Sequence, residues 1–154
     1  MIRVQASVPM PASAADAWAL LTDWPRHSRW IPATVVTVTE QKGGVGTRFV
    51  GRTGVGPMAF DDPMTVTVFE PPVDGRSGRC EVEKTGRVVL GRAGFVIRAD
   101  GSAACTVSWW EDVTLAPEPL TRYAEPLVAR VAQRQLTQVL RAAAAELAAR
   151  PDVR

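Results

Sequence analysis

The chain has 154 residues, of which 46% are hydrophobic and 22% charged, a composition typical of one soluble globular domain. Its 18 basic and 16 acidic residues are spread along the sequence without a basic block, so we expect no nucleic-acid partner. The two cysteines lack metal-ligand spacing and His27 is the single histidine, so we expect no metal site, and no motif indicates a cofactor.

The first thirty residues predict one strand followed by two short helices. Residues 2–8 alternate apolar and polar side chains, which is typical of a half-buried strand. Ser13 and Asp16 resemble the capping pair that opens a helix, and Pro25 ends that helix. A second short helix or turn is expected over residues 26–31.

The N-terminal residues also bear on location. They begin as a strand rather than with the charged and apolar regions of a signal peptide. No apolar run approaches the roughly eighteen residues that a membrane helix needs. We therefore expect a cytoplasmic protein with no membrane insertion.

Six further strands are predicted downstream, because apolar and polar residues again alternate between glycine- and proline-rich turns. The connections are short, which favours antiparallel hairpins over crossover units. The predicted strands cover residues 34–40, 47–53, 58–69, 78–84, 87–98 and 102–115.

The last third of the sequence, residues 117–150, predicts a long helix with a broad apolar face. Apolar residues recur there at steps of three and four, as one face of a helix requires. Because Pro126 interrupts the pattern, the helix either kinks there or begins afresh with Pro126 in its first turn. The predicted stripe includes Tyr123, Ala124, Leu127, Val131, Val139, Ala143 and Leu147, widened by Leu136 and Leu140.

Gln135 lies close to this stripe, where an aliphatic residue would be expected. Its amide either reaches solvent at the edge of the stripe or faces a ligand where the helix crosses a cavity. Such a broad apolar face must be covered, and the upstream strands are the only candidates.

The turns predict how the last three strands pair. The expected connections are a three-residue loop at residues 99–101 and a two-residue turn at 85–86. They put the odd positions of the strands at 87–98 and 102–115 on one apolar face, together with Cys80 and Val82 of the strand before them. This register places Gly91 opposite Trp109 and makes Glu111 the one acid on that face. It also places Cys80 and Cys105 too far apart for a disulfide. Trp110 points outward, where an exposed indole would indicate a homodimer contact or a covering loop.

The predicted fold class is α+β, with the order β-α-α-β6-α and a curved seven-stranded antiparallel sheet wrapped around the long C-terminal helix. Residues 1–150 form a single domain in this prediction, and residues 151–154 a short tail.

At this point the chain resembles the START/polyketide cyclase-dehydrase-like superfamily (SRPBCC), whose helix-grip fold is shared with birch-pollen-allergen-like proteins. The resemblance covers essentially the whole chain. It rests on residues 8–11 leading into 14–21, on 23–25 with 30–32, on 64–69 before 71–72, and on 107–113 ahead of the final helix. It implies an elongated apolar cavity between sheet and helix. Polyketide cyclases, aromatases, dehydratases and lipid or hormone carriers are among the similar proteins, and the resemblance transfers no catalytic residue to this chain.

Glu111 is the first candidate for catalysis. A carboxyl in an apolar pocket is disfavoured in its charged form, which suits a general acid or base. Alternatively it forms a structural ion pair with Arg87 or Lys84. His27 is the second candidate, because imidazole titrates near neutral pH. As a lone histidine in a surface loop near the expected cavity mouth, it is alternatively incidental.

Asp62 shares a face with Phe60 and Met64 if the strand alternates regularly, which would point its carboxylate inward. Alternatively Pro63 marks a bulge and the carboxylate is solvated.

These residues support three hypotheses. The first is binding of a hydrophobic or aromatic small molecule, polyketide- or lipid-like, in the cavity. The second is a polyketide cyclase/dehydratase-type enzyme that uses an acid there. The third is a protein-interaction module with a collapsed cavity. The predicted ligand-binding residues are Trp30, Asp62, Phe95, Val107, Trp109, Tyr123, Leu127, Val131 and Gln135.

Overall fold

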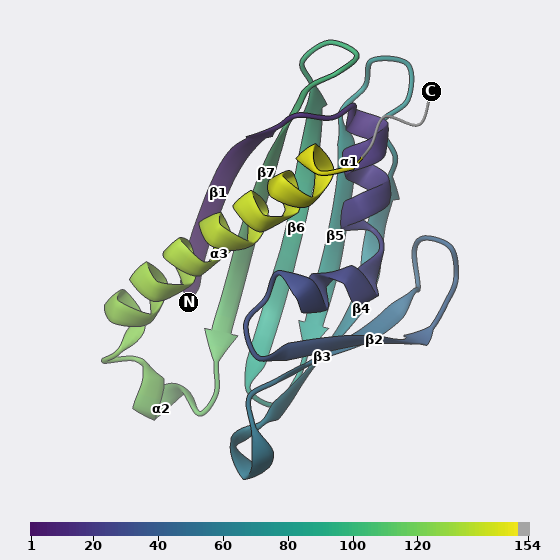
Figure 1. The fold of residues 1–154 in the computed structure, drawn as a ribbon. Helices are drawn as coiled ribbons and strands as arrows, with labels where there is room; N and C mark the ends of the chain where they lie inside the picture. The colour runs from purple at the N-terminus through teal and green to yellow at the C-terminus, as the bar shows by residue number, and fades with distance from the viewer. Residues whose placement is uncertain (151–154) are drawn as a thin grey trace.

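Seven strands and a long C-terminal helix make up most of the chain (Figure 1). The computed structural model describes residues 1–150, except the side chain of Leu120, and the predicted tail at 151–154 lies outside the described residues. The elements are β1 (Ile2–Met10), α1 (Ala14–Leu21), the 3-10 helix η1 (Trp24–Arg29), β2 (Thr34–Glu40), β3 (Arg48–Thr53), the short 3-10 helix η2 (Gly56–Met58), β4 (Phe60–Glu70), β5 (Gly78–Thr85), β6 (Val89–Ala99), β7 (Cys105–Leu115), α2 (Glu118–Thr121) and α3 (Glu125–Ala148).

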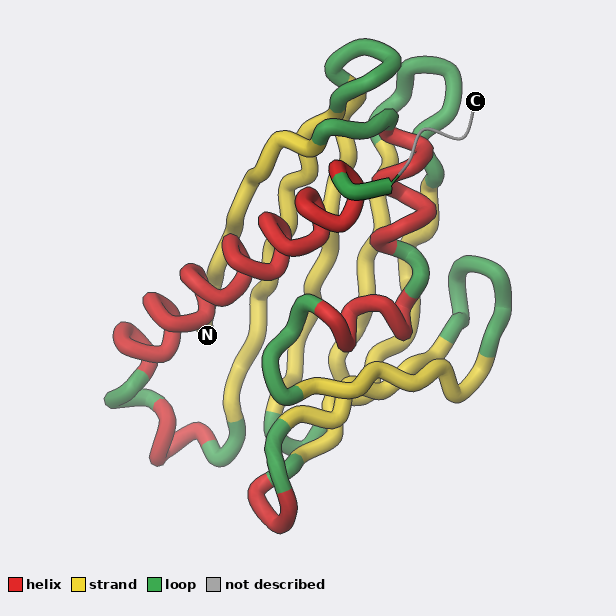
Figure 2. The backbone as a smooth tube through the Cα atoms, viewed as in Figure 1, coloured by secondary structure: helices red, strands yellow, loops and turns green. Residues whose placement is uncertain are grey.

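The strands form one antiparallel sheet in the order β1-β7-β6-β5-β4-β3-β2. Figure 2 shows this sheet as a bent layer, with β2 and β3 turned across its lower end. The helices α3, α1 and η1 all lie on one side of it (Figure 1). This arrangement confirms the predicted α+β fold, a curved sheet that grips the final helix, with α2 and η2 as short additions.

The N-terminal elements form as their sequence predicts. Burial alternates residue by residue along β1, so its apolar side chains face the core. Ser13 caps α1, since its hydroxyl oxygen accepts a hydrogen bond from the backbone N–H of Asp16 at 3.1 Å. The helix η1 begins at Trp24, two residues earlier than expected, with Pro25 in its first turn.

The helix α3 begins afresh at Glu125 with Pro126 in its first turn, which is one of the two predicted alternatives. Its buried residues are Leu136, Val139, Leu140, Ala143 and Leu147, all from the predicted stripe. No helix among residues 1–150 combines the length and hydropathy that a membrane crossing requires.

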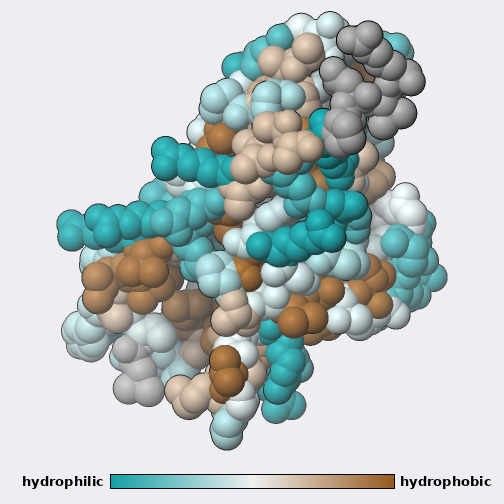
Figure 3. All heavy atoms as spheres, in the orientation of Figure 1, coloured by the Kyte–Doolittle hydropathy of each residue, from teal (hydrophilic) through white to brown (hydrophobic). Residues whose placement is uncertain are grey.

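The first half of the predicted stripe is wrong. Tyr123, Leu127 and Val131 are 83%, 67% and 57% exposed, and Figure 3 shows apolar atoms gathered on the outer side of this half of α3. The inward positions there are Val128 and Ala132, eight and four residues before Leu136. A shift of one residue turns a side chain by about 100° around a helix, because a turn takes 3.6 residues.

The predicted strand pairing was wrong in register but right in face. Arg98 pairs with Thr106 across a loop at residues 100–104, and Lys84 pairs with Gly91. Both loops are longer than expected, so Trp109 lies opposite Phe95 and not opposite Gly91. Because each strand is displaced by an even number of residues relative to its partner, every side chain keeps its predicted face. Both cysteines are buried and free, as expected.

Candidate ligand-binding cavity

The inner face of the sheet and α3 surround a cavity of about 280 Å³. This volume lies near the lower end of the roughly 300–1,000 Å³ that ligand pockets span. Most of the wall is apolar. From the sheet it includes Val4, Val36, Phe49, Met64, Val82, Phe95, Trp109 and Val113, and from α3 it includes Val128, Ala132, Leu136 and Val139.

Aromatic rings form the rigid part of this wall. Trp24, from η1, stacks on Phe49 with ring centroids 4.3 Å apart and planes 11° from parallel. Trp109 lies 5.9 Å from Phe95 and 5.5 Å from the ring of His27. Flat side chains of this kind offer large apolar contact areas with little conformational freedom to lose.

A buried ion pair interrupts the apolar wall. The Lys84 ammonium donates a hydrogen bond to Asp62 Oδ2 at 2.7 Å, and the two side chains are only 9% and 13% exposed. Burial by itself would lower the pKa of Lys84, but the carboxylates of Glu111 and Asp62 outweigh it and raise that pKa above its ordinary value. The lysine is therefore a cation at neutral pH.

A glycine next to Lys84 allows β6 and β7 to approach each other closely. Gly91, its partner on β6, has φ of 140°, and a Cβ atom there would lie 2.2 Å from the carbonyl oxygen of Asp112. Only glycine fits this position, because any Cβ atom would collide with the backbone of the neighbouring strand β7.

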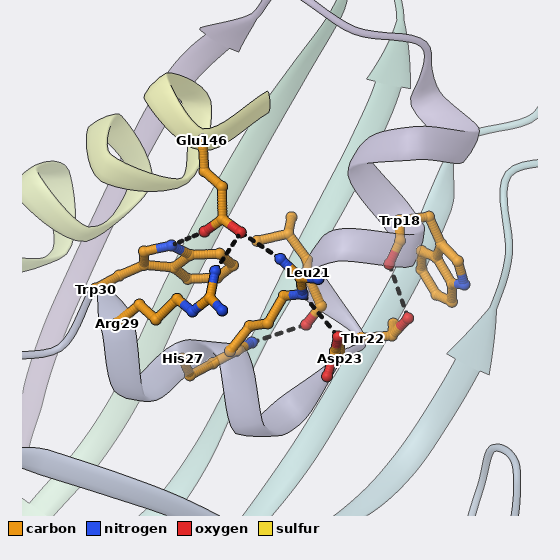
Figure 4. Close-up of polar contacts among 9 residues, drawn as sticks. Trp18, Leu21, Thr22, Asp23, His27, Arg29, Trp30 and Glu146 are labelled. Atoms are coloured by element: carbon orange, nitrogen blue, oxygen red, sulfur yellow. Dashed lines mark hydrogen bonds and ion pairs between the residues drawn. The ribbon is translucent and has the colours of Figure 1, made fainter. Parts of the chain in front are cut away.

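His27 is buried rather than exposed in a surface loop, which corrects the expected position. Its Nε2 lies 2.8 Å from the carbonyl oxygen of Leu21 (Figure 4). A carbonyl only accepts, so Nε2 carries the proton and Nδ1 is left as an acceptor. Burial lowers the pKa of His27 to about 4, and the imidazole is therefore neutral at pH 7.

Glu146 on α3 ties η1 to the helix beside the cavity. Its Oε2 accepts a hydrogen bond from Trp30 Nε1 at 2.8 Å, and its Oε1 pairs with Arg29 at 3.2 Å and also with Arg26 (Figure 4). This explains why Trp30, a predicted ligand-binding residue, does not line the cavity. Its indole N–H is directed to the helix instead.

Six of the predicted site residues line the cavity: His27, Asp62, Phe95, Trp109, Glu111 and Gln135. The sheet alternation points Asp62 inward, because the only irregularity in the pairing of β4 lies between Val66 and Val68 and not at Pro63.

The other predicted ligand-binding residues lie elsewhere. Val107 is fully buried in the core, facing Val8 and Ile97 on the neighbouring strands. Tyr123, Leu127 and Val131 are exposed, because the inward face of α3 runs through Val128 and Ala132.

The predicted site residues did not include Lys84 and Cys80, although the predicted register put Cys80 on the inner face and Lys84 was named as a possible ion-pair partner of Glu111. Both lie at even positions of β5 beside Val82, and that alternation could have identified them. Burial raises the pKa of the Cys80 thiol to about 12, so it stays protonated. Among residues 1–150, no cluster of three or more histidine, cysteine or acidic side chains is placed to hold a metal ion.

The sequence matches one protein family over residues 1–150, described as polyketide cyclase / dehydrase and lipid transport. No curated protein matches the sequence.

Solved structures share the fold at low sequence identity. A protein from Thermus thermophilus superposes with a TM-score of 0.77 at 14% identity, covering 96% of this chain and 97% of that one. The Zhui aromatase/cyclase from Streptomyces sp. R1128 gives 0.71 at 17% identity, with 95% and 93% covered. Norcoclaurine synthase from Thalictrum flavum gives 0.64 at 16% identity, with 97% and 94% covered. At these identities the likeness concerns the fold alone.

Proposed function

Because the chain belongs to the polyketide cyclase, dehydrase and lipid transport family, we propose that it binds a hydrophobic or aromatic small molecule, polyketide- or lipid-like, in the cavity between the sheet and α3. The observation that carries this proposal is the largely apolar wall around about 280 Å³ of space. A cavity of this kind gains free energy when an apolar ligand replaces water, at roughly 25 cal/mol per Å² before the costs of ordering.

A second candidate function is catalysis of the cyclase or dehydratase type. The charged residues Lys84, Asp62 and Glu111 on the cavity wall favour it, because charged groups in an apolar cavity act strongly on a reacting ligand. Glu111 is the group to move protons there, since His27, with a pKa of about 4, is a weak base at neutral pH. In that case Glu111→Gln abolishes turnover while ligand binding persists. A collapsed-cavity interaction module is not carried further, because the described residues surround open space.

Binding in the cavity is testable with neutral probes and one blocking substitution. Isothermal titration calorimetry would use 2-naphthalenemethanol as an aromatic probe and 1-decanol as an aliphatic probe. Ala132→Phe adds a ring at a cavity-lining position of α3, whereas Ala145→Phe makes the same change on the exposed side of the helix.

We expect saturable one-to-one binding of at least one probe by the wild-type protein and by Ala145→Phe, and at least tenfold weaker binding by Ala132→Phe. The proposal fails if the wild type binds neither probe, or if Ala132→Phe binds as tightly as the wild type.

A further inference from the structure

The charged groups on the cavity wall do not balance. Lys84 contributes one positive charge, Asp62 and Glu111 each contribute a negative one, and the formal charge of the wall is −1. His27 adds none at neutral pH, because burial holds its pKa at about 4. The Lys84 ammonium is already hydrogen-bonded to Asp62 and attracted by Glu111. An anionic ligand would therefore meet an excess of negative charge where little water screens it.

Two polar atoms of the same wall lack a partner. Asp62 Oδ1 and Trp109 Nε1 are both buried, and neither forms a hydrogen bond with any described residue. The Trp109 side chain is 9% exposed and lies two residues from Glu111 on β7. Buried polar atoms are normally hydrogen-bonded, so unpaired ones beside a cavity indicate where a ligand supplies the missing group.

The missing groups define a ligand chemistry. Asp62 Oδ1 accepts only from a donor, while Trp109 Nε1–H donates only to an acceptor. A hydroxyl group offers both functions, and an amine offers donors together with a charge that offsets the wall. A carboxylate offers acceptors alone and adds a second negative charge.

We propose that the cavity selects a neutral or cationic ligand whose polar group donates hydrogen bonds, a hydroxyl or an amine, and discriminates against carboxylates such as free fatty acids. This inference rests on the proposed function, because it specifies the class of ligand for the same cavity. Lys84 serves there as a counter-ion within the wall, and its charge is not free to bind an anion.

Three probes with one apolar body test the inference. They are 2-naphthalenemethanol, 2-(aminomethyl)naphthalene and 2-naphthoic acid, titrated calorimetrically at pH 7 and constant ionic strength. The wild-type protein is expected to bind the alcohol and the amine at least about tenfold more tightly than the carboxylate. Glu111→Gln brings the formal charge of the wall to zero. We expect this variant to lower the ratio of the dissociation constant of the carboxylate to that of the alcohol by about tenfold.

Glu83→Gln is the matched control, because Glu83 lies exposed on the outer side of β5 and changes the net charge of the protein equally. It should leave the preference unchanged. If the alcohol and amine bind but the carboxylate binds equally well, the inference is wrong while the proposed function stands. If Glu83→Gln lowers this ratio of dissociation constants as much as Glu111→Gln, overall charge sets the preference and the inference is also wrong. If none of the three probes binds and 1-decanol does not bind either, the proposed function fails and the inference fails with it.

Discussion

Lys84 and Asp62 form the one ion pair within the cavity wall among the described residues, and removing Lys84 leaves the Asp62 carboxylate without its counter-ion. We expect Lys84→Met to lower the free energy of unfolding by about 3–5 kcal/mol, measured by urea denaturation at pH 7. The double variant Lys84→Met/Asp62→Asn removes the orphaned carboxylate and should recover part of that loss. A single variant as stable as the wild type would contradict a buried, charge-balancing role for Lys84.

His27 makes stability depend on pH below neutrality. Its pKa is about 4 in the folded state, against an ordinary value of 6.5, so between these values the unfolded chain binds the additional proton. Stability is therefore lost as the pH falls, and the contribution is about 1 kcal/mol per pH unit near pH 5.

His27→Gln keeps a side-chain N–H for the Leu21 carbonyl but does not titrate. Urea unfolding between pH 6.5 and 5 should show a flatter pH dependence in this variant than in the wild type. Equal slopes in the two proteins would rule out a buried neutral imidazole.

At the residue scale, the hairpin register predicted the inward position of Glu111, and regular alternation gave an inward Asp62 as one of two alternatives. It did not predict the burial of Lys84, because lysine is almost never buried unless paired and the pairing depends on how three strands align. No sequence pattern predicted the contacts of Glu146 either. It lies off the predicted stripe, and its bond to Trp30 joins residues 116 positions apart.

At the element scale, a pair of leucines tests which face of α3 is turned toward the sheet. Leu140 is fully buried, so Leu140→Ala should cost about 2–5 kcal/mol of stability. Leu127 is 67% exposed, so Leu127→Ala should change stability by no more than about 0.5 kcal/mol. Thermal and urea unfolding of both variants would measure this, and similar losses in the two would contradict the orientation of the first half of α3.

The strands show which part of an element is readable from sequence. The faces of β5, β6 and β7 followed from period-two alternation, but their register did not. The residues at 85–86 and 99–101 fit short turns, yet the loops of the structure are longer. Displacing a strand by an even number of residues relative to its partner keeps every apolar side chain on the same face, so the hydrophobic pattern does not distinguish the two registers. In α3, the predicted stripe ran through Leu127 and Val131, whereas the inward face runs through Val128 and Ala132, one residue later along the helix.

At the scale of the whole molecule, the order of elements and the period of each segment were enough to predict a curved sheet around a helix, and the structure has that architecture. The cavity is a different matter. Its volume is what remains after about thirty side chains have packed, and a few changes of size would close it. The sequence therefore predicted that sheet and helix meet, but only some of the residues that border the space between them.

The proposed function requires that an apolar ligand binds inside this cavity and not on the exposed apolar surface of α3. Methyl-detected NMR of valine- and leucine-labelled protein, titrated with 2-naphthalenemethanol, tests it most directly. We expect saturable shifts for the lining residues Val82, Leu136 and Val139, with Leu127 and Val131 unchanged. Shifts confined to Leu127 and Val131, with the lining residues unperturbed, would place the ligand on the outer surface and contradict it.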